Sequence, residues 1–253
     1  MASTHPFELS EQLVYEGQFS KLLVRNLNVV ELKFTVGRTP IAETAQNFQL
    51  QPTNLLFTGE ATAKGFFAKL FGLHFHYRSE STVDPQSLTV LRTNTLDEQG
   101  KRRRTSETVF DRATNRIIWT QRNPDAAAHE APRIIESPMG DANHDLISAL
   151  YYLRTLTLKP RAQFELVLSD SGRVYRVPVR VVETKRIKSV LGNVFATRID
   201  LEVFGKNRPV QGTGRMSLWL TNDKRRIPVL ARITTDIGTL ELTLKNATSG
   251  VAN

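Results

Sequence analysis

Alternation of apolar and polar residues over many short segments is the feature that most limits how this chain can fold. Successive side chains of a β-strand point to opposite faces of a sheet, so a period of two indicates a strand with one buried face. In one such segment the charged residues Arg198, Asp200 and Glu202 alternate with the residues of the opposite, mainly apolar face. That face comprises Phe195, Thr197, Ile199, Leu201 and Val203. The same period recurs over residues 175–181, 216–220, 227–233 and 240–244. We therefore expect a mainly β protein.

Short polar segments separate these runs at the spacing of β-hairpins. Residues that favour turns fill four of them, at 97–100, 111–115, 169–172 and 221–224. Strands joined in this way form an antiparallel meander, because a parallel pair needs a crossover of a dozen or more residues. Pro178 and Pro228 lie inside apolar runs and cannot donate a ladder hydrogen bond. We expect these two strands to be bulged there or to lie at a sheet edge.

One principal helix is expected over Asn143–Arg154. Asp141 or Asn143 can cap its N-terminus, and Asp145 suits its first turn. Leucines at helical spacing form a stripe that we expect to be buried: Leu146, Leu150 and Leu153.

The remaining segments set the expected domain organisation. Residues 66–71 fit a short amphipathic helix or a strand, and we favour a helical turn followed by a strand from Leu73. Residues 123–141 form one long loop, either partly disordered or a lid over a pocket. We expect an N-terminal tail over residues 1–12, a single antiparallel β domain over 13–245 and a C-terminal tail over 246–253.

Composition excludes several classes of protein. The 253 residues include no cysteine, which excludes disulfides, thiolate chemistry and cysteine-ligated metal. No apolar run reaches the length of about 18 residues that a membrane-spanning helix needs. Met1–Pro6 has neither the basic nor the apolar region of a signal peptide. We expect the periplasm or cell envelope if an export signal was removed, and otherwise the cytoplasm.

The net charge of +9 would attract anionic lipids, glycolipids, anionic envelope polymers or nucleic acid. The densest cluster follows an expected hairpin turn and comprises Lys101, Arg102, Arg103 and Arg104. It either contacts an anionic partner or is a solvated tip that discourages aggregation. Nucleic acid is the least expected partner, because no aromatic residue for base stacking lies within the cluster. The sequence leaves the oligomeric state open.

Several segments resemble the DUF3108 family of bacterial envelope proteins. Asp145–Arg154 resembles the family's helix signature, and Leu218–Val229 resembles its closing strand pair, followed by Ile237–Leu240. Leu13–Gly17 is similar to its usual opening. The family has no established activity, so the resemblance implies no catalytic residues. It implies a curved antiparallel sheet, or a partly open β-barrel, that wraps one principal helix and is similar in outline to lipid carriers.

Two motifs suggest enzyme or metal chemistry and are better explained otherwise. Asp170-Ser-Gly172 resembles an aspartic-protease motif, but Asp236-Ile-Gly238 lacks the hydroxyl residue of a second copy. A turn explains the first motif equally well. His74 and His76 would share a strand face, as a metal half-site needs, but no third ligand is evident. We expect no catalytic residue, no metal and no cofactor.

Two functions of different classes remain. The first is a non-catalytic envelope protein that binds an amphiphilic or lipid-like ligand in an apolar concavity between sheet and helix. Its expected lining is aromatic: Phe67, Phe71, Phe75, Trp119, Tyr151 and Trp219. The second is a structural or protein-interaction module with a filled core. A cavity on the order of several hundred Å³ would favour the first, and a closely packed interior would favour the second.

Overall fold

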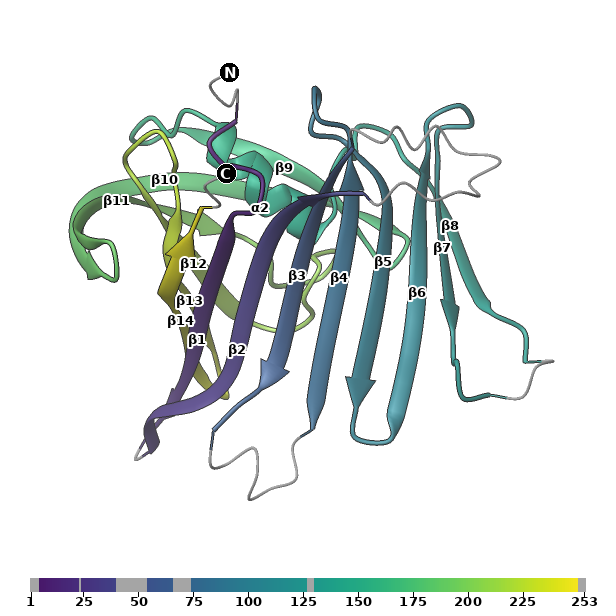
Figure 1. Ribbon diagram of the computed structural model, residues 1–253, viewed down its shortest axis with the longest axis horizontal. Coiled ribbons are helices and arrows are strands. Elements are labelled where there is room, and N and C mark those ends of the chain that lie inside the picture. Colours follow the sequence, from purple (N-terminus) through teal and green to yellow (C-terminus); the bar gives the residue numbers. More distant parts are fainter. Residues whose placement is uncertain (1–4, 23, 40–53, 66–73, 127–129, 250–253) are drawn as a thin grey trace.

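The computed structural model describes residues 5–22, 24–39, 54–65, 74–126 and 130–249. Within these ranges the chain forms one antiparallel sheet of 14 strands and one helix (Figure 1). The mainly β fold expected from the alternation is confirmed. Two meanders make up the sheet, and the helix lies between them in the sequence.

The first meander comprises β1 (Gln12–Lys21), β2 (Val24–Arg38), β3 (Leu55–Ala63), β4 (Phe75–Val83), β5 (Val90–Gln99), β6 (Arg102–Asp111), β7 (Arg116–Arg122) and β8 (Arg133–Pro138). Helix α2 (Leu146–Thr155) follows. The second meander comprises β9 (Gln163–Asp170), β10 (Arg173–Ser189), β11 (Gly192–Leu201), β12 (Gly214–Thr221), β13 (Pro228–Thr235) and β14 (Gly238–Thr248).

Pairing of β1 with β14 joins the two meanders into one sheet, in the order β8-β7-β6-β5-β4-β3-β2-β1-β14-β13-β12-β11-β10-β9. All four expected hairpin turns are confirmed, because each connects two strands that pair. Pro228 begins β13 beside a bulge in its pairing with β12. Pro178 directly precedes Val179, the residue at which the pairing of β10 with β11 begins. Both prolines therefore sit where a ladder donor is dispensable.

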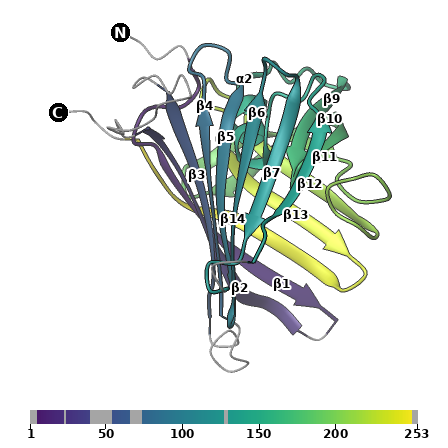
Figure 2. The same cartoon turned by 90° about the vertical axis from the view of Figure 1, so that its right-hand side faces the viewer.

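The sheet curls around α2 as a partly open barrel, with β8 and β9 as its edges (Figures 1 and 2). The turn between β9 and β10 packs on the opposite edge, where the Ser137 hydroxyl donates to the Gly172 carbonyl over 2.9 Å. Gly172 has φ of +74°, and a Cβ there would lie 2.7 Å from Cβ of Trp119. Glycine is thus required at this contact by both conformation and space.

Apolar residues fill the barrel on both sides of the helix. One cluster, which includes Phe57, Val83, Ile117 and Tyr151, packs between α2 and β2–β7. A second cluster packs the opposite side of α2 against the aliphatic residues of β9–β13. A third, around Trp219 and Leu244, lies near β1 and β14. The helix therefore contacts the sheet on more than one side.

Helix α2 differs from the prediction in its start and in its buried face. Asp145 is the N-cap: its side chain accepts from the Ser148 amide, and the Ser148 hydroxyl accepts from the Asp145 amide. The expected burial of the leucine stripe is wrong for Leu146, which is 46% exposed. Leu150 is half-buried and Leu153 is buried. Because the sheet surrounds the helix, residues off the stripe become buried instead, including Tyr151.

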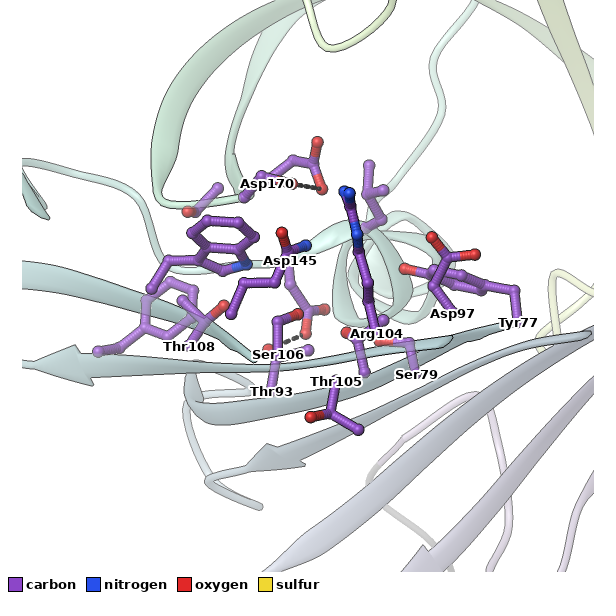
Figure 3. Close-up of a pocket in the computed structure, with 17 residues that line it drawn as sticks. Tyr77, Ser79, Thr93, Asp97, Arg104, Thr105, Ser106, Thr108, Asp145 and Asp170 are labelled. Atoms are coloured by element: carbon purple, nitrogen blue, oxygen red, sulfur yellow. Dashed lines mark hydrogen bonds between the residues drawn. The ribbon is translucent and has the colours of Figure 1, made fainter. Parts of the chain in front are cut away.

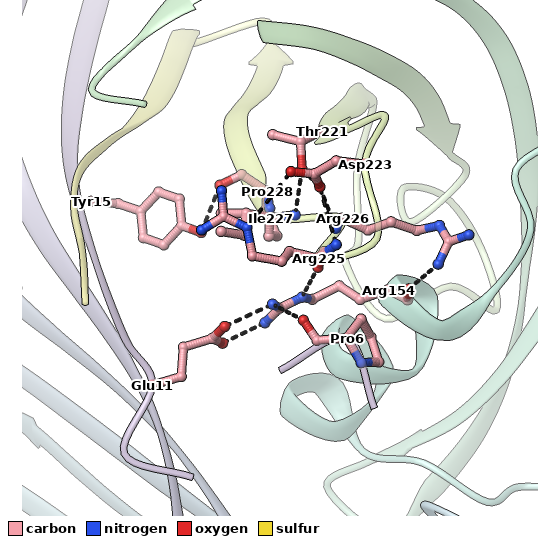
Figure 4. Close-up of polar contacts among 10 residues, drawn as sticks. All are labelled: Pro6, Glu11, Tyr15, Arg154, Thr221, Asp223, Arg225, Arg226, Ile227 and Pro228. Atoms are coloured by element: carbon pink, nitrogen blue, oxygen red, sulfur yellow. Dashed lines mark hydrogen bonds and ion pairs between the residues drawn. The ribbon is translucent and has the colours of Figure 1, made fainter. Parts of the chain in front are cut away.

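Arg154 ties α2 to the N-terminal segment and to the turn between β12 and β13 (Figure 4). Its side chain is fully buried, and its two terminal nitrogens pair with the two carboxylate oxygens of Glu11 over 2.5 and 2.8 Å. It also donates to the carbonyls of Pro6 and Arg225. Most of its donors are therefore satisfied, as a buried guanidinium requires.

Three expectations about boundaries need correction. The predicted loop over 123–141 contains strand β8, an edge strand whose consecutive Ile134 and Ile135 hide the alternation. Strand β14 extends to Thr248, so part of the predicted C-terminal tail is paired. In the predicted N-terminal tail, Phe7 and Glu11 are buried. Residues 66–73 lie outside the described ranges, and β4 begins at Phe75.

Candidate functional site

The inward-facing residues of β4–β7 change from apolar to polar along the strands. Next to the helix they are aliphatic or aromatic and belong to the core: Val83, Val90, Phe110 and Ile117. The following cross-strand rows carry hydroxyl groups: Ser79, Ser81, Thr93, Thr95, Ser106 and Thr108. The next row pairs Asp97 with Arg104 near the turn between β5 and β6. Polarity therefore increases from the core toward that turn.

A polar cavity of about 180 Å³ lies between these rows, the start of α2 and the turn between β9 and β10 (Figure 3). Three carboxylates, one arginine and many hydroxyl groups line it. The lining residues are Tyr77, Ser79, Thr93, Thr95, Asp97, Arg104, Thr105, Ser106, Thr108, Phe110, Trp119, Gln121, Asp145, Leu146, Ser169, Asp170 and Ser171. We call this space the polar cavity.

Asp145 fixes the wall that the helix contributes. One carboxylate oxygen caps α2, and the other accepts hydrogen bonds from the hydroxyls of Ser81 and Thr93, each over 2.5 Å. The same carboxylate thus joins the helix start to β4 and β5. A buried carboxylate with three donors is well satisfied, so Asp145 mainly positions the helix.

Asp170 is the less satisfied carboxylate of the cavity. Its neighbour Ser171 donates to it over a long 3.5 Å. Burial raises the pKa of Asp170 above its ordinary value, and the nearby charge of Asp145 adds to this effect. Burial also raises the pKa of Tyr77, again with a contribution from Asp170. Asp170 therefore has fewer hydrogen bonds from the protein than Asp145 and more capacity to accept one from a bound group.

Other polar groups beside the cavity lack protein partners. The hydroxyl of Ser169, a cavity residue that is 3% exposed, has no hydrogen-bond partner among the described residues. Nδ1 of the adjacent buried His144 likewise lacks one within the described ranges. Burial lowers the pKa of His144 to about 4, so its ring is neutral at neutral pH. Buried polar atoms normally have partners, which makes Ser169 a free hydrogen-bonding position on the cavity wall.

Arg104 and Gln121 also line a second, more open hollow, which we call the basic mouth. Six basic side chains surround it: Lys101, Arg102, Arg103, Arg104, Arg122 and Arg133. Asp125 and Glu130 are its acidic residues. The structure thus brings the four predicted basic residues together and adds two more, Arg122 at the end of β7 and Arg133 at the start of β8. Sequence reasoning missed Arg122 and Arg133, although both flank the loop that faces the expected hairpin.

Ion pairs compensate part of this charge. Arg102 pairs with Asp97 over 2.8 Å, and Arg103 pairs with Glu98 over 3.1 Å. Among the described residues, Arg104 makes no ion pair, although it lines both the mouth and the cavity. Figure 3 shows its side chain rising between Asp97 and Asp170. A guanidinium in this position is available to phosphate or carboxylate.

The predicted aromatic lining does not come together. Trp119 lines the polar cavity, whereas Tyr151 is in the core, stacked on Phe57 at 4.1 Å. Phe75 borders a different surface hollow near His74 and His76. Trp219 is buried in the third core cluster, between the cations of Lys185 and Arg232. Phe67 and Phe71 lie outside the described residues.

The residues considered for metal and catalysis are also separated. Both ring nitrogens of His76 contact carboxylates, Glu98 over 3.0 Å and Glu60 over 2.8 Å. His74 precedes β4 and is exposed. Within the described ranges, no group of three or more potential ligands is arranged to hold a metal ion. Asp170 is the last residue of β9, whereas Asp236 lies in the turn between β13 and β14, and β13 is four strands away from β9 in the sheet.

Comparison with known proteins places the chain. A family model described as "Protein of unknown function (DUF3108)" matches residues 30–245. The chain belongs to this family. The DUF3108 resemblance seen in the helix and the closing strands is confirmed, while Leu13–Gly17 lies before the matched range. No curated protein matches the chain.

One solved structure shares the fold of this DUF3108 protein, and two others are similar to it at lower TM-scores. A β-barrel-like protein of the DUF1849 family from Brucella abortus has 7% identity and a TM-score of 0.57, over 96% of this chain and 99% of that chain. A Bacteroides fragilis protein described as exported, with a YmcC-like fold, has 8% identity and a TM-score of 0.35, over 98% and 100%. A Parabacteroides distasonis protein described as a lipoprotein has 9% identity and a TM-score of 0.34, also over 98% and 100%.

These comparisons indicate no catalytic family. Among the described residues, we find no helix with the length and apolar character needed to cross a membrane. The sheet order and the DUF1849 structure establish the fold, an open antiparallel sheet around one helix.

Proposed function

We propose that this DUF3108 protein is a non-catalytic binding protein of the bacterial envelope. Its ligand is an amphiphile, such as a glycolipid or an anionic lipid, whose polar head group occupies the polar cavity. The observation that carries the proposal is the polar cavity itself, because a hydroxyl-lined space inside an otherwise apolar barrel has no use in packing.

The size of the cavity limits the ligand to a head group. Pockets for drug-sized ligands have volumes of roughly 300–1,000 Å³, whereas the polar cavity has about 180 Å³. Apolar clusters fill the barrel on both sides of α2, where we had expected an apolar concavity. An acyl chain would therefore remain outside the barrel.

The chemistry of the wall favours a head group that is both hydroxylated and anionic. Ser106, Thr95 and the unpartnered hydroxyl of Ser169 can exchange hydrogen bonds with sugar or glycerol hydroxyls. Arg104 can pair with a phosphate or carboxylate, and the basic mouth would attract it over a longer range. Asp170, whose pKa is raised by burial, can share a proton with such a group.

A second candidate is a structural or protein-interaction module without a small ligand. The three filled core clusters favour it, since most of the described interior is closely packed. The two candidates differ in one respect: the first requires the polar cavity to be occupied by a molecule that can be removed.

Native mass spectrometry of protein purified from a bacterial host tests the proposal. We expect a co-purified adduct with the mass of an anionic or glycosylated lipid. Ser106→Phe fills the cavity from β6 and should abolish the adduct. Thr120→Phe on neighbouring β7 is the matched control and should retain it, because Thr120 is not among the residues that line the polar cavity.

Two outcomes contradict the proposal. One is the absence of any adduct after the protein has been incubated with a bacterial envelope lipid extract. The other is an adduct that persists in Ser106→Phe, which would place the ligand elsewhere.

A further inference from the structure

Two neighbouring hairpin turns carry exposed aliphatic side chains, Leu22 and Ile237. Leu22, between β1 and β2, is 86% exposed and has φ of +46°. A left-handed conformation is unfavourable for leucine and is normally adopted by glycine or asparagine. Ile237 is 63% exposed in the two-residue turn between Thr235 and Gly238.

These two turns lie side by side. Strands β1 and β14 pair as far as Ser20 and Thr239, so the turns that follow and precede them are adjacent. The ring of Phe19 packs so closely beneath the second turn that a Cβ on Gly238 would lie 2.5 Å from it. Phe19, Leu22 and Ile237 thus form an apolar tip patch at this end of the sheet. Neither the core nor the polar cavity uses Leu22 or Ile237.

The tip patch belongs to the same rim of the barrel as the basic mouth. Strands alternate in direction across the sheet, so the β1–β2, β5–β6 and β13–β14 turns and the β7–β8 connection all lie at one end. Figure 1 shows these connections along the lower rim, and in Figure 2 the β1–β2 and β13–β14 turns project side by side toward the right. Lys21 and Arg25, both exposed, flank Leu22 within its hairpin.

We propose that this rim docks on a lipid bilayer whose surface carries anionic head groups. Aliphatic side chains at turn tips can enter the interface between head groups and acyl chains, and flanking cations bind the anionic surface. A protein partner would be expected on a larger continuous apolar patch, whereas here the apolar tips are single residues: Lys21 and Arg25 flank Leu22, and Asp236 is the acidic neighbour of Ile237. The complementarity of this positive rim with an anionic surface selects the bilayer.

Docking does not depend on the cavity ligand, because it rests on the turns and the rim charge. If both proposals hold, the basic mouth faces the bilayer, and a lipid head group can enter the cavity while its chains remain in the membrane. Failure of one proposal leaves the other intact: Ser106→Phe blocks the cavity without altering the tip patch.

Vesicle flotation of the full chain tests the docking. Vesicles of equal parts phosphatidylglycerol and phosphatidylcholine should bind the protein at low salt, and pure phosphatidylcholine should bind it weakly. Leu22→Asn combined with Ile237→Asn should reduce binding about tenfold, because each turn loses an aliphatic group that would be buried in the bilayer interface. Val190→Asn is the matched control, because Val190 is 55% exposed in the β10–β11 turn at the other end of the strands.

Asparagine suits the left-handed conformation of Leu22 and is common in turns such as that of Ile237, so the double variant should unfold at an equal or higher urea concentration than the original protein. Loss of flotation with an unchanged fold supports docking. Three results overturn it: no flotation at low salt, flotation that survives Leu22→Asn with Ile237→Asn, or equal losses in the Val190→Asn control. Equally strong binding to soluble dextran sulfate, unaffected by the tip variants, would also overturn it, because the rim would then be a site for polyanions.

Discussion

The inner face of β4–β7 and the inner face of β9–β13 follow the same alternation and have opposite character. In the second half the inward residues are aliphatic and buried, as Val177, Ile199 and Leu218 illustrate. In β4–β7, serine and threonine take the inward positions between the apolar core and the β5–β6 turn. The comparison teaches that a period of two determines which residues face inward, and that their chemistry determines whether the space is filled.

The difference follows from what each half meets. Aliphatic side chains of β9–β13 pack directly on Ala149 and Leu153 of the helix. The hydroxyl rows of β4–β7 meet the polar start of the helix at Asp145. Two hydroxyls of these rows, those of Ser81 and Thr93, donate hydrogen bonds to its carboxylate. Serine and threonine are too small to fill the remaining space, and the polar cavity results.

The largest effect is expected from the ion pair that holds the helix between the two halves. Arg154→Met should lower the free energy of unfolding by about 3–5 kcal/mol, because Glu11 would remain buried without a counter-charge. Urea denaturation measures the loss. Combining it with Glu11→Leu should recover most of the stability, since no buried charge is then left. A loss below about 1 kcal/mol in Arg154→Met alone would show that the helix does not depend on this pair.

Exchanging the chemistry of the two inner faces should have unequal effects. Val177→Thr places a hydroxyl among aliphatic side chains and should cost about 1–3 kcal/mol. Thr95→Val makes the reverse change beside the polar cavity and should alter the unfolding free energy by only about 0.5 kcal/mol. Chemical denaturation of both variants gives the comparison directly. Similar losses would mean that the two faces are equally packed.

The smallest effect concerns His76, on β4 beside the rim. Hydrogen bonds that His76 donates to Glu98 and, with a smaller effect, to Glu60 raise the pKa of His76 above its ordinary value. A raised pKa stabilises the fold fully below the unfolded-state pKa of about 6.5, and the stabilisation is lost as the pH rises through the folded-state value. With a third of the side chain exposed, solvent screening should limit the effect to about 0.5 kcal/mol.

Unfolding curves of the original protein and of His76→Gln, recorded on either side of neutrality, measure this contribution. The difference between them should favour the original protein at acidic pH and shrink at alkaline pH. A difference that grows with pH would contradict the assigned role of the two glutamates.

Local patterns were sufficient to predict the strands of the alternating segments, the four hairpins and the approximate position of the helix, and short segments resembled the family. They failed where long-range contacts override local preference. Leu146 is exposed and Arg154 is buried because the sheet and Glu11, rather than the helix stripe, determine what α2 buries. Strand β8 was missed because it has few residues and pairs on one side only, which relaxes the alternation.

The site was predictable only in part, for the same reason. Lys101–Arg104 are contiguous, so the basic cluster is visible in the sequence, whereas Arg122 and Arg133 join it through strand register. The aromatic lining failed because aromatic residues mostly enter the core, as Tyr151 does. A more useful signal was present: serine and threonine occupy the inward positions of β4–β6, where a packed face would carry valine or leucine.

Acrylamide quenching of the two tryptophans tests most directly whether the first half encloses an accessible cavity while the second half is filled. The chain contains two tryptophans, so Trp219→Phe and Trp119→Phe each leave a single reporter. Trp119 lines the polar cavity, and Trp219 is enclosed by the third core cluster and two cations. We predict a quenching constant several times larger for Trp119, reduced when Ser106→Phe fills the cavity. Equal and weak quenching of both tryptophans would contradict an open polar cavity and would favour the filled structural module.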